Sequence, residues 1–246
     1  MKQRTAADII RMNSPNMTKR RNGHKPIMIV NHITEGLAMG SISWLCNPKS
    51  QASANFLVTR LGKIYQLVDI QDAAWCNGTQ SKDDKKKYYY KRSTNPIVQA
   101  KVVNANMYTV SIEHEGFSYK DGCGALTEEQ YQATLWLHKY IIDTIKRLYG
   151  YDIRIDREHI VGHYEIAPRE KPNCPGSKFP WQRLISDLKL MEGQKMNVVK
   201  IDYNGKKIEV EGKLVDNKNY VSARELFEKL GHKVDWNSAT KEIIVR

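Results

Sequence analysis

The chain has 246 residues, with 41% hydrophobic and 27% charged side chains, which are ordinary values for a globular protein of one or two domains. No apolar run approaches the ~20 residues that span a bilayer, so we expect no membrane insertion. The formal net charge of +12 indicates an anionic partner or surface. Zinc-finger pairs, a helix-turn-helix signal and a ribonucleoprotein aromatic motif are all absent from the sequence, so we expect no nucleic-acid partner.

The four cysteines, at positions 46, 76, 123 and 174, are too few and too scattered to indicate a disulfide scaffold. We predict free thiols in a protein made in a reducing compartment. The N-terminal segment has positive charges but lacks the apolar stretch of ~7–15 residues that a secretory signal needs. We therefore expect synthesis in the cytoplasm without a signal peptide.

Residues 1–24 are polar, and we expect a lightly packed arm with a short helix over Thr5–Met12. Lys25–Asn31 is short, apolar and rich in β-branched residues, which predicts a central buried strand that ends just before His32. Met39–Asn47 has mixed signals, and its conformation is left open.

Ala54–Thr59 and Lys63–Val68 predict a β-hairpin with Gly62 at the position that needs a positive φ. A basic run, KDDKKKYYYKR at residues 82–92, predicts a solvated loop. Tyr108–His114 alternates as a strand does. Its period sends Glu113 to the face opposite the apolar side chains.

The clearest helix is predicted over Thr127–Tyr149, where Thr127 and Gln130 form a capping box and Gly150 ends the helix. His138 falls on the apolar stripe of this helix, so we interpret it as a core histidine. Phe179–Met191 predicts a second amphipathic helix.

The composition changes after a predicted linker at residues 192–196, and residues 197–246 predict a small α+β module. Asn204-Gly205 joins two alternating strands as a hairpin turn, and Ser222 caps a helix. We expect the module to fold on its own small core. The predicted core residues are Val198, Ile208, Val210, Val221, Leu226, Leu230, Trp236, Ile243 and Val245.

The stretch HIVGHYEIAPREKPNCPG, at residues 159–176, places an imidazole and a thiol on a short, turn-rich segment. His163 and Cys174 suit Zn²⁺, and a catalytic zinc needs three protein ligands with a fourth position left for water. His32 stands where a buried strand gives way to a loop, so it is the best candidate for the third ligand.

Six stretches in this order, NHITEG, ANFLVTRLGKIYQLV, AWCNG, VSIEHEGF, IVGHYEIAPREK and CPGSKFPW, resemble the type 2 N-acetylmuramoyl-L-alanine amidases. That zinc family includes phage endolysins, bacterial autolysins and peptidoglycan recognition proteins. The resemblance implies an α/β catalytic domain over residues 25–191, with a central mixed sheet flanked by helices and a zinc site at one end of the sheet. It implies Zn²⁺ as cofactor, held by His32, His163 and Cys174.

The resemblance also implies roles for other residues. Glu113 matches the general base, with Glu115 as an alternative. Lys171 matches the lysine that stabilises the oxyanion, but the KPNC spacing is one residue longer than usual, so Arg169 stays an alternative. Trp75 and Asn77 in AWCNG are expected to bind substrate.

Cys76, in the same AWCNG stretch, stands where many relatives have histidine, so both a buried thiol and a metal contact stay open. The function implied is hydrolysis of the amide bond between N-acetylmuramic acid and L-alanine in peptidoglycan. The alternative is a non-catalytic peptidoglycan-binding protein of the same fold. Without a signal peptide, we favour a phage endolysin released by a holin or by lysis over an exported autolysin.

The tail resembles the copper amine oxidase N-terminal-like module, or stalk domain, through YVSARELFEKLGHKVDWNSATKEIIV. Copper is not implied, because His232 is the tail's only histidine. Wall targeting, dimerisation and permanent packing on the catalytic domain are all open as roles for it.

Overall fold

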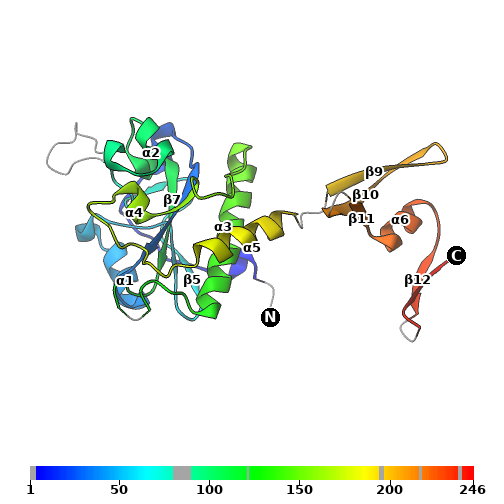
Figure 1. Cartoon of the computed structure of the whole chain (residues 1–246), viewed down its shortest axis with the longest axis horizontal. Coiled ribbons are helices and arrows are strands. Elements are labelled where there is room, and N and C mark those ends of the chain that lie inside the picture. The colour runs from blue at the N-terminus through cyan, green and yellow to red at the C-terminus, as the bar shows by residue number, and fades with distance from the viewer. Residues whose placement is uncertain (1–3, 80–89, 121, 194–196, 216–217, 238–239) are drawn as a thin grey trace. The chain divides into compact units, whose positions relative to one another are not determined.

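The computed structural model describes residues 4–79, 90–120, 122–193, 197–215, 218–237 and 240–246 (Figure 1). Most of the basic run at residues 82–92 therefore lies outside the described residues. The chain divides into two compact units, Met1–Leu188 and Lys189–Arg246. The exact domain boundaries expected from the sequence stay a prediction.

The first unit is built on a six-stranded mixed sheet. In spatial order its strands are β1 (Ile9–Arg11), β5 (Ile64–Gln66), β4 (Phe56–Val58), β7 (Thr109–His114), β3 (Met28–Ile33) and β8 (Ile160–Gly162). Only the β4–β5 pair of this sheet is antiparallel, and the other four pairs are parallel. The predicted α/β class with a central mixed sheet is confirmed.

The predicted hairpin is confirmed as β4 and β5, which pair from Phe56↔Gln66 to Val58↔Ile64. Gly62 in the connecting turn has φ +73°, a conformation that favours glycine. A Cβ at this position would lie 2.6 Å from the carbonyl oxygen of Glu129. The glycine therefore also allows the turn to approach the start of the long helix.

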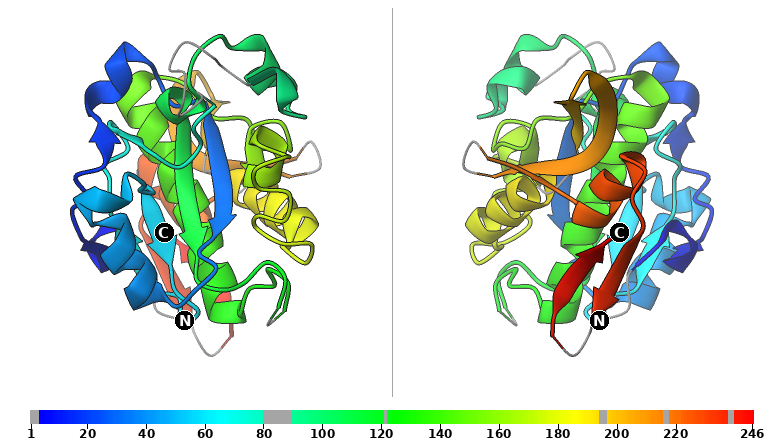
Figure 2. Two further views of the ribbon diagram at one scale, coloured as in Figure 1. Left: turned by 90° about the vertical axis from the view of Figure 1, so that its left-hand side faces the viewer. Right: turned by 90° about the vertical axis from the view of Figure 1, so that its right-hand side faces the viewer.

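That helix, α3 (Glu128–Tyr149), begins and ends as predicted. The Thr127 side chain accepts a hydrogen bond from the backbone of Gln130, and Gly150 adopts the left-handed conformation at the other end. Its apolar face packs on the sheet together with α5 (Trp181–Gly193) (Figure 2). Members of this core include Tyr131, Leu137 and Ile141 of α3, Val110 and Ile112 of β7, and Leu184 and Leu188 of α5.

Shorter elements complete the unit. The helices are α1 (Ala38–Leu45), α2 (Pro96–Ala100) and α4 (His163–Ile166), and the 3₁₀ turns are η1 (Ala6–Asp8), η2 (Lys19–Gly23), η3 (Pro48–Ser50), η4 (Tyr90–Arg92) and η5 (Ala105–Tyr108). A two-stranded ribbon pairs β2 (Met17–Thr18) with β6 (Ala73–Ala74).

The expectation of a lightly packed N-terminal arm is wrong. Ile9–Arg11 forms a parallel pair with β5 and extends the sheet by one strand. Arg21 is fully buried, and its guanidinium donates hydrogen bonds to the carbonyl oxygens of Ile70 and Thr109 at 2.8 Å each. This polar sequence is ordered by tertiary hydrogen bonds, which local patterns do not reveal.

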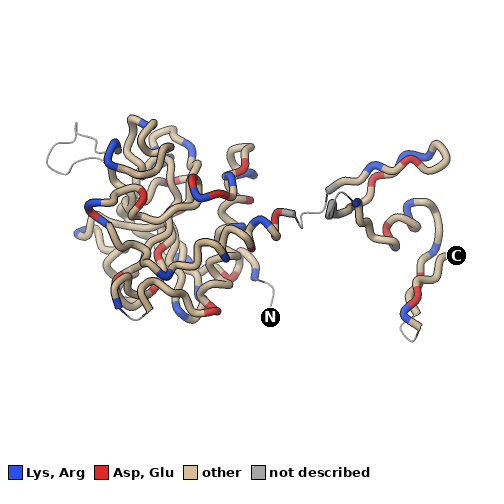
Figure 3. The backbone as a smooth tube through the Cα atoms, in the orientation of Figure 1, with Lys and Arg blue, Asp and Glu red and all other residues tan. Residues whose placement is uncertain are grey.

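Within its described residues, the second unit contains a three-stranded sheet, a short helix and a separate hairpin. Its elements are β9 (Asn197–Tyr203), β10 (Lys206–Val215), β11 (Lys218–Val221), α6 (Ala223–Lys229), β12 (Val234–Asn237) and β13 (Glu242–Val245). Asn204 and Gly205 both have positive φ, which confirms the predicted hairpin turn. Acidic and basic residues are interleaved along β9 and β10 (Figure 3), and Lys200 pairs with Glu209 there.

The predicted core of this unit is only partly correct. Ile208 and Val210 are buried, but Val198, Trp236, Ile243 and Val245 are exposed. Among the described residues, β12 and β13 pair only with each other, and on this hairpin Val234 is buried while Trp236, Ile243 and Val245 are exposed. A small two-layer core is therefore not completed within the described part of this unit.

Among the described residues, no helix has the length and apolar character needed to cross a membrane.

Candidate functional site

Strand register places the candidate residues at the same level of the sheet. His32 on β3 is paired with Glu113 on β7, and Asn31 is paired with Gly162 on β8. His163 directly follows Gly162, so it stands beside His32. Three parallel strands thus deliver two imidazoles and one carboxyl to their carboxyl ends, where ligands bind in open α/β sheets.

His163 is held by the way α4 begins. Gly162 has an extended backbone, and its N–H donates to the Glu165 carboxylate at 2.8 Å. Glu165 also pairs with Arg157. The ring of His163 lies edge-on to the ring of His32, with 4.4 Å between ring centroids.

Cys174 reaches the same point from the loop after α4. Its carbonyl oxygen accepts a hydrogen bond from the backbone of Tyr164 at 3.0 Å, and its sulfur accepts one from the Ile33 N–H at 3.4 Å. A Cβ on Gly162 would lie 2.9 Å from Pro175 Cδ, so the glycine allows this close approach. The loop is therefore fixed to the ends of both β3 and β8.

The donor atoms of His32, His163 and Cys174 all lie within 4.8 Å of one another. Burial holds the pKa of His32 well below its ordinary value and lowers the pKa of His163 to about 3. Both rings are thus neutral and have a free lone pair. Burial also raises the pKa of the Cys174 thiol and so disfavours the thiolate. A bound cation would favour the thiolate and lower this pKa again.

This donor set fits zinc. Two neutral imidazoles and one thiolate match its preference for nitrogen and sulfur ligands, and three protein ligands leave a position open. The fit rests on the chemistry and the closeness of the three side chains.

Glu113 has the surroundings expected of a proton acceptor. Its Oε1 accepts a hydrogen bond from the Cys76 thiol at 3.7 Å, and its Oε2 is buried without a hydrogen-bond partner among the described residues. Burial raises the pKa of the carboxyl to about 7. The nearby charge of Lys171 opposes part of this increase.

Glu115 is engaged elsewhere. Strand β7 ends at His114, and the Glu115 carboxylate accepts backbone hydrogen bonds from Ala38 at 3.1 Å and Arg60 at 2.8 Å. It therefore ties the start of α1 to the turn between β4 and β5. This placement favours Glu113 over Glu115 as the base.

Lys171 and Arg169 are both exposed on the loop between α4 and Cys174. The positive charge of Lys171 contributes to the lowered pKa of His163 as well as acting on Glu113. Lys171 thus lies close enough to influence the site. Its choice over Arg169 as the oxyanion donor stays a prediction.

Trp75 is partly buried, and its indole N–H donates to Thr18 Oγ1 at 2.9 Å. Asn77 is fully buried, and its amide donates to the hydroxyls of Thr109 and Ser111. A substrate-binding role stays a prediction for both.

His114 was given no role by the sequence, yet it supports His32. Its Nδ1–H donates to the carbonyl oxygen of His32 at 2.8 Å, and its Nε2 accepts from the Thr134 hydroxyl at 3.1 Å. His138 is a buried core histidine as predicted, and it contacts Asn31 at 3.2 Å. The sequence did contain one signal for the role of His114, because this histidine falls on the apolar face of its predicted strand.

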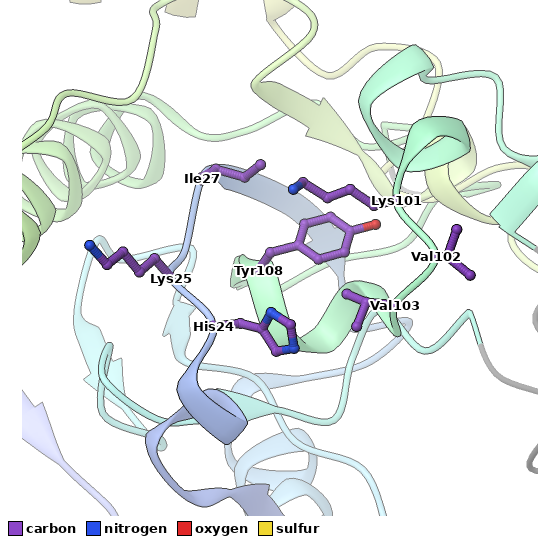
Figure 4. A pocket seen from close by; sticks show the side chains of 7 residues that line it. All are labelled: His24, Lys25, Ile27, Lys101, Val102, Val103 and Tyr108. Atoms are coloured by element: carbon purple, nitrogen blue, oxygen red, sulfur yellow. The ribbon is translucent and has the colours of Figure 1, made fainter.

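A hollow of about 340 Å³ lies at the other end of the same strands (Figure 4). Its lining includes Ile27, which precedes β3, and Tyr108, which precedes β7. His32 follows Ile27 by five residues, or ~16 Å of strand. This hollow is therefore separate from the candidate metal site.

Two sequence families match the chain. The family described as N-acetylmuramoyl-L-alanine amidase matches residues 22–177, and the copper amine oxidase N-terminal domain matches residues 195–246. N-acetylmuramoyl-L-alanine amidase A of Achromobacter lyticus is 29% identical over 164 residues, covering 62% of this chain and 77% of that protein. The 1,6-anhydro-N-acetylmuramyl-L-alanine amidase AmpD of Haemophilus influenzae is 27% identical over 139 residues, covering 56% and 60%.

Among solved structures, the crystal structure of a selenomethionine AmpD derivative has a TM-score of 0.51 at 21% sequence identity. The superposition covers 74% of this chain and 95% of that chain. At this identity the similarity concerns the fold.

Proposed function

Because the chain belongs to the N-acetylmuramoyl-L-alanine amidase family, we propose that it hydrolyses the amide bond between N-acetylmuramic acid and L-alanine in bacterial peptidoglycan. The observation that carries the proposal is the cluster of His32, His163 and Cys174 next to the buried carboxyl of Glu113. A metal site and a proton acceptor are the two parts that metal-assisted amide hydrolysis requires.

His32, His163 and Cys174 are proposed to hold Zn²⁺. When bound, Zn²⁺ polarises the amide carbonyl as a Lewis acid and makes water a better nucleophile at neutral pH. The hydrogen bond from His114 to the His32 carbonyl fixes the backbone of one ligand, and the Ile33 N–H orients the sulfur of another. The protein thereby sets the positions of its donors before the metal arrives.

Glu113 is the proposed general base. It takes a proton from the attacking water and returns it to the leaving nitrogen of L-alanine. A carboxyl with a pKa of about 7 can both accept and donate a proton near neutral pH. Lys171 is proposed to place its ammonium against the oxyanion that develops on the carbonyl.

The bond specificity can be tested on purified peptidoglycan. We expect free L-alanine amino termini to appear with time, detected by amino-group labelling and mass spectrometry, while no new reducing sugar ends form. Protein carrying Glu113→Gln is the negative control. New reducing ends would show that a glycosidic bond is cut, and binding without any cleavage would favour the non-catalytic alternative.

The second unit is proposed to bind the wall. It begins at Lys189, beyond the core residues Leu184 and Leu188 that α5 contributes to the first unit. Its exposed Tyr203, Tyr220 and Trp236 provide aromatic faces that suit packing against sugar rings or peptides.

Truncation after Gln194 tests this role, because it keeps all of α5. We expect a folded, metal-containing protein that cleaves soluble muropeptide at a rate close to that of the full chain but co-sediments less with intact walls. The full chain and a Trp236→Ala variant are the comparisons in the sedimentation assay. Loss of activity on soluble muropeptide would instead show that the tail is part of the catalytic fold.

A further inference from the structure

The hollow in Figure 4 is lined by two lysines, a histidine and apolar side chains. His24 and Lys25 border it from the segment before β3, and Lys101 borders it directly after α2. No acidic side chain is among its lining residues, and neither lysine forms an ion pair within the described part of the chain. These surroundings favour a negatively charged ligand.

Tyr108 supplies a hydrogen-bond donor that the fold leaves unused. Its side chain is 2% exposed, and its hydroxyl is buried without a hydrogen-bond partner among the described residues. Burial raises the pKa of this hydroxyl, so it keeps its proton and can donate. An unpaired buried hydroxyl costs free energy, and a ligand with an accepting oxygen would recover that cost.

The Tyr108 hydroxyl is covered by side chains of one surface segment. In Figure 4 it points toward Lys101 and Val102, and the Lys101 ammonium lies 5.4 Å from the centre of the Tyr108 ring. Val102 itself is 72% exposed. Because a lysine side chain is long and flexible, its ammonium can turn from the ring to an anion in the hollow. The same movement uncovers the hydroxyl.

We propose that this hollow binds a phosphate ester of a small polyol. The Tyr108 hydroxyl donates to one phosphate oxygen, and the ammonium of Lys101 pairs with the negative charge, as lysine does in other phosphate sites. Ile27 and Val103 offer apolar walls for the carbon atoms of the polyol. The volume of about 340 Å³ falls at the lower end of the range for small-molecule sites and exceeds the room that a lone phosphate fills.

Polyol phosphates occur as free small molecules and as the repeating units of anionic polymers in bacterial walls. The net charge of +12 favours the polymer, because a chain of many phosphates is attracted more strongly than a single one. The hollow lies at the end of β3 and β7 opposite the candidate metal site. A polymer bound there would hold the first unit on the wall without covering that site. This consequence rests on the proposed function, whereas the binding itself does not.

Titration of the full chain with glycerol 3-phosphate tests the site, with inorganic phosphate as the comparison. We expect glycerol 3-phosphate to bind more tightly and to shift the NMR signals of Tyr108 and Lys101. Tyr108→Phe removes only the hydroxyl and should weaken binding by at least ~10-fold, the size expected for a hydrogen bond to a charged group. Without ligand, this variant should unfold at the same or a higher temperature, because it loses an unpaired buried hydroxyl.

Lys49→Gln is the matched control for Lys101→Gln. It removes the same charge from a lysine in η3 that does not line the hollow. We expect Lys101→Gln to weaken binding of glycerol 3-phosphate by ~10-fold and Lys49→Gln to leave it unchanged. Equal losses in the two lysine variants, or unchanged binding in Tyr108→Phe, would overturn the proposal, because the attraction would then come from net charge alone.

Sedimentation of the full chain with bacterial walls separates the two sources of the ligand. Acid extraction removes phosphodiester-linked polymers from walls and leaves peptidoglycan. If the polymer is the ligand, the natural protein should sediment more than Tyr108→Phe with unextracted walls and equally with extracted walls. Equal sedimentation with both, with binding of glycerol 3-phosphate intact, would assign the hollow to a free phosphate ester. Turnover of soluble muropeptide should be the same in all variants, so a failure of the proposed amidase function would be seen separately.

Discussion

Replacing Glu113 with glutamine is expected to reduce turnover by ~10²–10⁴-fold, the range for loss of a general base, while bound metal stays unchanged. Glutamine keeps the shape of the side chain but cannot accept the proton of water. It also removes a buried carboxyl whose Oε2 has no hydrogen-bond partner among the described residues. We therefore expect thermal unfolding of the variant at the same or a higher temperature, so lost turnover would not reflect lost folding.

The pH profile provides a second signature of Glu113. Burial raises the pKa of this carboxyl to about 7, so the carboxylate form is present above that pH and is lost as pH falls through it. Turnover of the natural protein should fall on the acid side as Glu113 gains its proton, and the residual activity of Glu113→Gln should lack that limb. Kinetics of the natural protein and of Glu113→Gln on soluble muropeptide, measured at pH values on both sides of ~7, would test for this limb.

Glu115→Gln is the matched control for these experiments. Its side chain holds the backbones of Ala38 and Arg60, and glutamine keeps one accepting oxygen. We expect turnover within a few-fold of the natural protein. Near-normal turnover in Glu113→Gln together with an inactive Glu115→Gln would assign the base role to Glu115.

Removing the metal should abolish hydrolysis of peptidoglycan, and adding Zn²⁺ should restore it. Metal analysis of the purified protein should find zinc, and a strong chelator should lower the unfolding temperature, because a ligand that binds only the folded state stabilises it. His163→Ala should lose both metal and activity. A fully active preparation that contains no metal would rule out the proposed mechanism.

His159→Gln is the control for His163→Ala. His159 lies four residues earlier, at the start of β8, and its Nδ1 pairs with Asp156 at 2.7 Å. Loss of this partly exposed pair should cost little stability and leave the metal content unchanged. Equal loss of metal in both variants would show that the effect arises from disturbed folding of this region.

Local patterns were sufficient for the elements that carry their own signals. The buried run of β3, the alternation of β7, the Gly62 and Asn204-Gly205 turns and the capped helix α3 each follow from neighbouring residues. Their types were correct and their ends differed by up to three residues. The candidate ligands could be named because each stands at the end of such an element or in a turn-rich stretch.

Features that depend on contacts distant in sequence were not predictable in this way. Strand β1 exists because Ile9–Arg11 pairs with β5, and its own three residues do not distinguish a strand from an arm. The hydrogen bonds of Glu115 to the start of α1 and to the β4–β5 turn could not be foreseen from VSIEHEG. The position of Cys76 beside His32 likewise depends on the anchoring of its backbone by Asn106.

The sulfur of Cys174 accepts its hydrogen bond from Ile33, a residue 141 positions earlier in the chain. During synthesis, the residues of β3 are therefore made long before those of β8. Cys174, the last candidate ligand, follows β8 in the chain. Pairings of such sequence separation form late, because loop closure must precede them. A nascent or prematurely terminated chain that stops before Cys174 lacks one donor of the site. Peptidoglycan cleavage can then begin only after nearly all of the first unit has been made.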